Sequence, residues 1–351
     1  MFAPSLTVPP TAKQNYMMMQ GHKNSVLELH WTADGDNILT CLPDKTLRLW
    51  DATTGESVKC MKGHQSFVNA CSTAPKGKPL CVSGSDDGTA KLWDFRRKGE
   101  VATFADRFQV TAVAFDAEGD RFFSGGLDNV LKCWDIRNDA EPYMVLPGHT
   151  DTITGIAVAP DGSVWTANNG RDNVAFPEPG PQYGQVLPDY VDDNPPEQIA
   201  RLTPGRELGW PYCNNTGGPA DLPFVRDVQT NPDGEELDCA ALPPVEQSMG
   251  AHSAPLGMTF VDGALPEPYG QGALIGVHGS WNRQPPRPPE VSFYPWRDGT
   301  LGAQQTFVGG FQNPDGSRWG RPVAAVAGPD GAVYITDDDA DAIYRLAPPR
   351  P

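Results

Sequence analysis

A repeat with a period of about 42 residues constrains the fold of this 351-residue chain more than any other feature. Gly-His pairs begin at residues 21, 63 and 148, and Trp-Asp pairs begin at residues 50, 93 and 134. Within each unit, short runs of alternating apolar residues are separated by turn residues, a pattern typical of β-hairpins. Small sheets of this kind bury their apolar faces by stacking on neighbours, so the pattern predicts an all-β chain.

Polar residues recur at fixed distances from each tryptophan and predict a structural hydrogen-bond network. A His, a Ser or Thr, an Asp and an indole N–H can satisfy one another while tying strands together. The predicted sets are His22–Thr40–Asp44–Trp50, His64–Ser83–Asp87–Trp93 and, in a unit that lacks the histidine, Ser124–Asp128–Trp134. The alternative is a catalytic role for these histidines and aspartates. Their regular spacing favours the structural role and resembles that of WD40 propeller blades, each a four-stranded sheet.

The repeat breaks down beside Trp165. Gly148-His149 opens a fourth unit, but a Pro-rich loop follows Trp165 and no further Trp-Asp pair appears. Residues 1–150 carry 16 Lys and Arg against 18 Asp and Glu, whereas the remainder carries 11 and 26 and contains no lysine. The halves therefore differ in origin, or they are ordinary domains with different surfaces. The acidic second half repels phosphates, so we expect no direct binding of nucleic acid.

Residues 170–250 are dense in Pro, Gly, Asn and Asp and predict long loops. Disorder is one interpretation, whereas Trp210 and two cysteines in this segment favour an ordered loop. A Cys213–Cys239 disulfide is predicted if the chain meets an oxidising environment. The other five cysteines lie in or near predicted strands without metal-type spacing, and we interpret them as buried or incidental thiols.

Residues 20–160 resemble the WD-repeat proteins of the U5 spliceosomal particle. The runs SVLELHWTADG, DKTLRLWDATTGE and GSDDGTAKLWDFRRK carry this resemblance. It implies a nuclear, non-catalytic scaffold that holds other splicing proteins. Such a propeller has seven blades, of which three and the start of a fourth are present here.

Residues 155–351 resemble the sorbosone and aldose sugar dehydrogenases that depend on pyrroloquinoline quinone, particularly the exported bacterial branch. The carrying runs are NNGRDN, LGWPYCN, AHSAPLGMTF, GVHGSWNRQPPRPP and DGSRWGRPVAAVAGPDGAVYITDDDADAIYRL. This resemblance implies a six-bladed propeller with the quinone on its axis, together with a bound Ca²⁺.

The second resemblance also implies binding residues. Arg321 stands where the family places an arginine for the carboxylates of the quinone, and a surface arginine is the alternative. The loop that resembles the family's central-channel loop contains His278, Ser280, Asn282 and Arg283, although it lacks the family's lysine. Gly170 and Arg171 match the segment whose carbonyls hold Ca²⁺, and exposed turn residues are the alternative.

We assign no catalytic residue. The family's general base is a histidine of an early blade, and an Arg-Asn pair precedes its calcium loop; both fall in the part that WD sequence replaces here. His64 and His149 have the spacing of WD blades, so we do not give either of them this role.

We therefore predict a hybrid all-β propeller of about three WD40 blades and about three quinone-dehydrogenase-type blades. It forms either one six-bladed ring or an open arc. The expected parts are an arm at 1–20, WD40 repeats at 21–154 and a dehydrogenase-like part at 155–351. Residues 14–20 are a candidate outer strand for the last blade.

The first functional hypothesis is a monomeric, non-catalytic scaffold for splicing proteins. The second is a sugar oxidoreductase dependent on pyrroloquinoline quinone and Ca²⁺, and the third is a chimera that performs neither task. No apolar run approaches the ~20 residues of a membrane-spanning helix. The first 20 residues lack the pattern of a secretory signal. The compartment stays open, because one half suggests the nucleus and the other suggests export.

Overall fold

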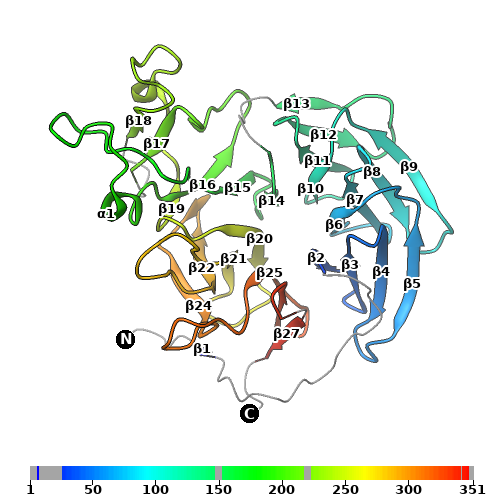
Figure 1. Ribbon diagram of the computed structural model, residues 1–351. Coiled ribbons are helices and arrows are strands. Elements are labelled where there is room, and N and C mark those ends of the chain that lie inside the picture. Colours follow the sequence, from blue (N-terminus) through cyan, green and yellow to red (C-terminus); the bar gives the residue numbers. More distant parts are fainter. Residues whose placement is uncertain (1–5, 8–25, 147–151, 217–222, 341, 348–351) are drawn as a thin grey trace.

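Six β-sheets form a closed ring in the computed structural model, which describes residues 6–7, 26–146, 152–216, 223–340 and 342–347 (Figure 1). The first strand of each sheet lies against the first strand of the next around the centre. The predicted all-β propeller of two kinds of blade is confirmed, and it is the six-bladed ring rather than the open arc.

Three four-stranded antiparallel sheets hold the three Trp-Asp repeats. The first contains β2 (Glu28–Trp31), β3 (Asn37–Cys41), β4 (Thr46–Asp51) and β5 (Ser57–Lys62). The second contains β6 (Val68–Thr73), β7 (Leu80–Ser85), β8 (Thr89–Asp94) and β9 (Glu100–Ala105). The third contains β10 (Val110–Phe115), β11 (Arg121–Gly126), β12 (Leu131–Asp135) and β13 (Met144–Leu146). Each Trp-Asp pair lies at the end of the third strand of its blade, and its indole is buried in the blade.

The second half supplies the other three blades. The fourth contains β14 (Ala157–Val158), β15 (Val164–Asn168), β16 (Glu197–Leu202) and β19 (Gln247–Met249). The fifth contains β20 (Pro255–Asp262), β21 (Gln271–Val277), β22 (Glu290–Arg297) and β24 (Gln305–Gly309), with the short β23 (Thr300–Leu301) paired to β22. The sixth contains β25 (Pro322–Ala327), β26 (Val333–Asp337) and β27 (Ala342–Leu346).

The N-terminal arm reaches the fifth blade rather than the sixth in the part that is described. Strand β1 (Leu6–Thr7) pairs in parallel with β24 at the outer edge of that blade. The predicted outer strand at residues 14–20 lies outside the described residues.

Apolar contacts close the ring at both junctions between the halves. At one junction, Ile153 is buried against Ala112 and Leu131 of the third blade and Val164 of the fourth. At the other, Leu29 and Ile38 of the first blade form one cluster with Ala332 and Tyr334 of the sixth. Blades of different types can therefore stack, because each presents a comparable apolar face.

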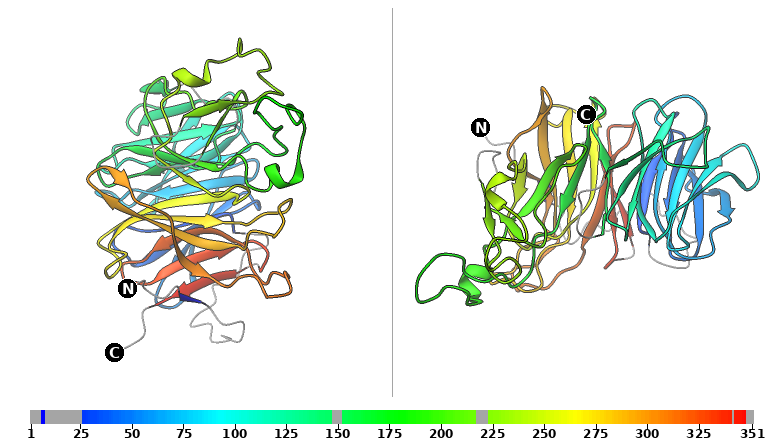
Figure 2. Two further views of the ribbon diagram at one scale, coloured as in Figure 1. Left: turned by 90° about the vertical axis from the view of Figure 1, so that its left-hand side faces the viewer. Right: turned by 90° about the horizontal axis from the view of Figure 1, so that it is seen from above.

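The long insertion within the fourth blade is ordered in its described residues. It contains α1 (Pro188–Val191), the hairpin of β17 (Cys213–Asn215) and β18 (Phe224–Arg226), and the 3₁₀ turn η1 (Cys239–Ala241). In the right-hand view of Figure 2, part of this green insertion extends away from the sheets. None of the described helices is long or apolar enough to cross a membrane.

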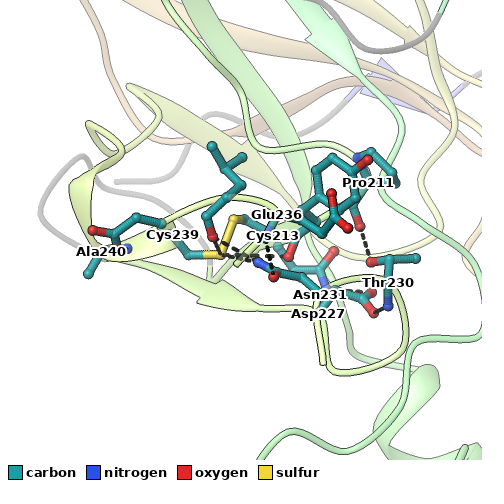
Figure 3. Close-up of a disulfide and its surroundings, with 12 residues drawn as sticks. Pro211, Cys213, Asp227, Thr230, Asn231, Glu236, Cys239 and Ala240 are labelled. Atoms are coloured by element: carbon teal, nitrogen blue, oxygen red, sulfur yellow. Dashed lines mark hydrogen bonds between the residues drawn. A yellow bond between two sulfur atoms is a disulfide. The ribbon is translucent and has the colours of Figure 1, made fainter. Parts of the chain in front are cut away.

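A disulfide joins Cys213 and Cys239 inside this insertion, with their Cα atoms 5.6 Å apart (Figure 3). Beside it, the buried Asn231 amide donates to the Leu237 carbonyl over 2.8 Å. The disulfide holds the β17 hairpin against η1. It links two cysteines that are 26 residues apart in the sequence.

Candidate functional site

The second WD blade contains a complete buried hydrogen-bond chain. Trp93 Nε1 donates to Ser83 Oγ over 2.8 Å, and Ser83 Oγ lies 2.7 Å from His64 Nε2. His64 Nδ1 lies 2.8 Å from Asp87 Oδ2. A neutral histidine protonated on Nδ1 satisfies every donor in this chain. Burial lowers the pKa of His64 despite the neighbouring carboxylate, and both of its ring nitrogens are engaged.

In the described residues, the first and third blades show part of the same hydrogen-bond chain. Trp50 Nε1 donates to Thr40 Oγ1 over 2.9 Å, and Trp134 Nε1 donates to Ser124 Oγ over 2.8 Å. In the first blade, Asp44 accepts from the backbone N–H of Thr46 over 3.0 Å. His22 and His149 lie outside the described residues.

A lysine substitutes for the missing histidine of the third blade. Lys132 Nζ lies 2.5 Å from Asp106 Oδ1 and also pairs with Asp128, the network aspartate predicted from the sequence. Asp106 belongs to the Ala105-Asp106-Arg107 segment that occupies the Gly-His position. The ammonium group therefore ties this segment to the turn after β11.

Exposed apolar side chains gather on the loops at one end of the WD blades. Phe67, Phe108 and Leu127 are 49%, 42% and 43% exposed. Backbone hydrogen bonds connect their loops. The Asp86 N–H donates to the Phe67 carbonyl over 3.0 Å and the Asp106 N–H donates to the Gly88 carbonyl over 2.8 Å, so the β7–β8 turn links the loops of Phe67 and Phe108. The Leu127 N–H donates to the Gln109 carbonyl over 3.1 Å, which joins the loops of Phe108 and Leu127. We call Phe67, Phe108 and Leu127 the apolar loop face.

In the second half, the predicted channel loop between β21 and β22 is held mainly by acidic residues. His278 Nε2 lies 2.8 Å from Asp338 Oδ1, and Arg283 Nη2 donates to Asp193 Oδ1 over 2.6 Å. Asn282 Nδ2 donates to Asp172 Oδ1 over 3.3 Å. His278 and Arg283 are thus already paired with carboxylates.

Ser280, the remaining predicted residue of this loop, is buried. Its Oγ accepts the backbone N–H of Arg287 over 2.7 Å, so it closes the loop on itself. The side-chain Nε of Arg287 is buried and has no hydrogen-bond partner among the residues that the structure describes. The loop therefore holds one unsatisfied cationic donor.

Two arginines at the entrance to β25 lie close together. Arg321 Nε donates to the His278 carbonyl over 3.3 Å, and Arg318 Nη2 donates to the Arg287 carbonyl over 3.3 Å. Burial, followed by the positive charge of Arg321, lowers the pKa of Arg318. Among the ion pairs of the described residues, neither guanidinium takes part. Sequence reasoning missed Arg318, although it stands three residues before Arg321.

The predicted calcium segment is anchored by a buried carboxylate. The backbone N–H of Gly170 donates to Glu197, which also accepts from the N–H of Ala254 over 3.2 Å. Burial raises the pKa of Glu197. The Arg171 side chain turns away to Asp227, with Nη1 2.6 Å from Oδ2. Sequence reasoning missed Glu197 because nothing in its local pattern distinguishes it.

These residues fit the two groups that the resemblance implies. Arg287, Arg318 and Arg321 offer guanidinium donors without carboxylate partners among the described residues, as a polyanionic quinone requires. In the described part of the chain, the backbone carbonyls of Gly170 and Arg171 accept no backbone hydrogen bond. Neutral carbonyl oxygens of this kind suit Ca²⁺.

Comparison with known proteins matches the two halves of the chain to two different families. Residues 149–348 match the TrAA12-like family, and residues 13–51, 55–94 and 99–135 match the WD domain, G-beta repeat. The similarity to WD-repeat proteins of the U5 particle, inferred from the sequence, is confirmed.

Curated proteins that match the WD part include two related to splicing. The U5 small nuclear ribonucleoprotein 40 kDa protein of Dictyostelium discoideum is 42% identical over 135 residues, which are 38% of this chain and 38% of that protein. Pre-mRNA-splicing factor cwf17 of Schizosaccharomyces pombe is 38% identical over 141 residues, 40% of this chain and 41% of that protein. The chain spans less than half the length of these relatives.

Among solved structures, the holo form of the pyranose dehydrogenase PQQ domain from Coprinopsis cinerea has a TM-score of 0.69. It shares 18% sequence identity and covers 94% of each chain. At this identity the likeness concerns the propeller fold alone.

Proposed function

The chain belongs to the TrAA12-like family and carries three WD40 repeats ahead of that region, and we propose that these repeats make it a non-catalytic protein-interaction scaffold related to splicing. The apolar loop face is the observation that carries this proposal. Exposed aromatic side chains on rigid, hydrogen-bonded loops are typical anchors of protein interfaces. The partners are proteins of the kind that assemble with the WD-repeat relatives, and the scaffold itself is a monomer.

The state of His64 supports a structural role for the WD half. A general base must reach the proton that it takes, with a ring nitrogen free to accept it. His64 is buried, and its two nitrogens face Asp87 and Ser83. Both ring nitrogens of His64 are therefore used in contacts that hold the second blade together.

A binding assay with purified U5 particle proteins tests the scaffold. The double substitution Phe67→Ser and Phe108→Ser should weaken binding at least ~10-fold, because truncating an aromatic anchor costs about 2 kcal/mol or more. Val58→Ser is the matched control, since Val58 is exposed on the outer strand β5, away from these loops. Failure of every such protein to bind the unsubstituted chain contradicts the proposal.

The second candidate is a quinone-binding oxidoreductase, and the paired Arg318 and Arg321 favour it. We propose that these arginines, with Arg287, hold the carboxylates of pyrroloquinoline quinone, while the carbonyls of Gly170 and Arg171 hold Ca²⁺. The bound quinone would supply a two-electron acceptor for the oxidation of a sugar alcohol or aldehyde. Glu197 contributes indirectly, because it fixes the backbone of Gly170.

Titration with pyrroloquinoline quinone in the presence of Ca²⁺, followed by tryptophan fluorescence, tests this candidate. Binding should be saturable in the unsubstituted protein and weakened at least ~10-fold in Arg318→Ala/Arg321→Ala, since charge-assisted contacts contribute about 1.5–3 kcal/mol each. Arg297→Ala is the control, because Arg297 is exposed at the end of β22. Reduction of a dye acceptor with aldoses then separates a binding site from an enzyme.

A further inference from the structure

Three potential metal ligands converge between the first two WD blades. They are Glu28 at the start of β2, Cys41 at the end of β3, and Cys71 within β6. Their ligand atoms all lie within 4.8 Å of one another. Both thiols are fully buried, and the Glu28 side chain is 27% exposed. The cluster is thus assembled from three strands of two blades.

Hydrogen bonding fixes the carboxylate at this point. Glu28 Oε2 accepts the backbone N–H of Cys71 over 2.7 Å, which joins the two inner strands. Glu28 Oε1 lies 3.6 Å from His30 Nε2, on the same side of β2. Glu28 Oε2 therefore holds the two strands together. Glu28 Oε1 faces the His30 imidazole, which can orient this oxygen or itself bind a cation.

We propose that Glu28, Cys41 and Cys71 form a binding site for a thiolate-preferring divalent cation of the zinc class. Two sulfur ligands and one carboxylate oxygen match the ligand types that zinc takes in proteins. Thiolates disfavour the hard cations Ca²⁺ and Mg²⁺, so this site differs in chemistry from the carbonyl set at Gly170. On binding, each thiol releases its proton to solvent and forms one sulfur–metal bond.

His30 or a water molecule would supply the fourth ligand of the cation. Carboxylates that ligate metals are themselves held by hydrogen bonds, as Glu28 is by the backbone N–H of Cys71. The partial exposure of Glu28 gives the cation a route of entry. Cys81 and Cys133 are buried too, yet neither joins such a group within the described residues. Burial of a thiol is therefore not what distinguishes this cluster.

Titration of the metal-free, full-length protein with Co²⁺, with the Cys213–Cys239 disulfide kept intact, tests the site. One equivalent of Co²⁺ should produce thiolate-to-cobalt charge-transfer absorption in the near ultraviolet. Zn²⁺ should then displace the Co²⁺ and abolish this absorption. Cys41→Ser and Cys71→Ser should each lower Co²⁺ affinity at least ~10-fold, and Glu28→Gln should lower it by a similar factor. Cys133→Ser, which removes a buried thiol of the third blade, should leave the absorption unchanged.

Thermal unfolding gives a second readout that does not require any ligand variant to fold. Zn²⁺ should raise the melting temperature of the unsubstituted protein and of Cys133→Ser by the same amount. Absence of thiolate-to-cobalt absorption in the unsubstituted protein overturns the proposal. Absorption that persists in Cys41→Ser/Cys71→Ser, with native circular dichroism, overturns it as well.

Discussion

The indole of Trp31 meets the ring of Tyr334 edge-on, with the ring centroids 4.9 Å apart and the planes inclined by 73°. Trp31 belongs to the first WD blade and Tyr334 to the last blade of the TrAA12-like region. This contact closes the ring between blades that match two different family models. It lies at one of the two junctions where apolar side chains of the two halves pack together.

Ile153 supports the opposite junction, and its truncation should destabilise the whole ring. Ile153→Ala removes buried methyl groups from a cluster shared by the third and fourth blades, so we expect a loss of about 2–5 kcal/mol in unfolding free energy. Urea unfolding followed by circular dichroism measures it. Val186→Ala serves as control because Val186 is exposed. Equal stability of the two variants would contradict the role of Ile153.

His64 should make the protein sensitive to mild acid. Burial lowers its pKa below the unfolded value of 6.5, so the unfolded state takes up the proton first as pH falls. The stabilising contribution is therefore fully present above about pH 6.5 and is lost progressively below it, down to the folded pKa. Unfolding free energies measured between pH 8 and pH 5 should fall more steeply in the unsubstituted protein than in His64→Gln. Parallel pH profiles would exclude this effect.

The Cys213–Cys239 disulfide should stabilise the insertion of the fourth blade. For a separation of 26 residues, the loop-entropy relation gives about 3.5 kcal/mol. Cys213→Ala/Cys239→Ala should therefore increase cleavage by protease within residues 170–250 before the blades unfold. Cys60→Ala, at an exposed free cysteine, should not. Unchanged cleavage in the double variant would mean that the bond adds nothing to the order of the loop.

Glu197 should control the geometry of the calcium segment. Glu197→Ala leaves the partly buried N–H groups of Gly170 and Ala254 without this acceptor, at about 1 kcal/mol for each lost hydrogen bond. We expect lower stability together with weaker Ca²⁺ binding, measured by calorimetry. Glu207→Ala is a suitable comparison, because Glu207 is partly buried but makes no contact with this segment in the described hydrogen bonds.

The repeat pattern predicted the WD blades well because its signals are local. The Ser-to-Trp spacing of ten residues follows from strand register: Ser83 pairs with Lys91, two residues before Trp93. The presence of a second kind of blade was predictable for the same reason, because no Trp-Asp pair follows residue 135. Closure of the ring could not be predicted from the sequence, because no local pattern encodes the packing of β2 against β25.

The candidate sites were only partly predictable. Arg321 was found through a family resemblance, whereas Arg318 and Glu197 gain their roles from burial and from neighbours distant in sequence. The cluster at Cys41 and Cys71 is the clearest example of a candidate site that could not be predicted from the sequence. The spacing of these cysteines resembles no metal motif, because their thiols meet only when two blades stack.

A double-mutant cycle between Trp31 and Tyr334 tests the closed hybrid ring most directly. Unfolding free energies of the unsubstituted protein, Trp31→Ala, Tyr334→Ala and the double variant give the coupling between the first and last blades. The closed ring predicts a favourable coupling of about 0.5–1.5 kcal/mol, the usual range for an edge-on aromatic pair. Strict additivity of the two substitutions would contradict it, because residues that do not touch across the junction cannot be coupled there.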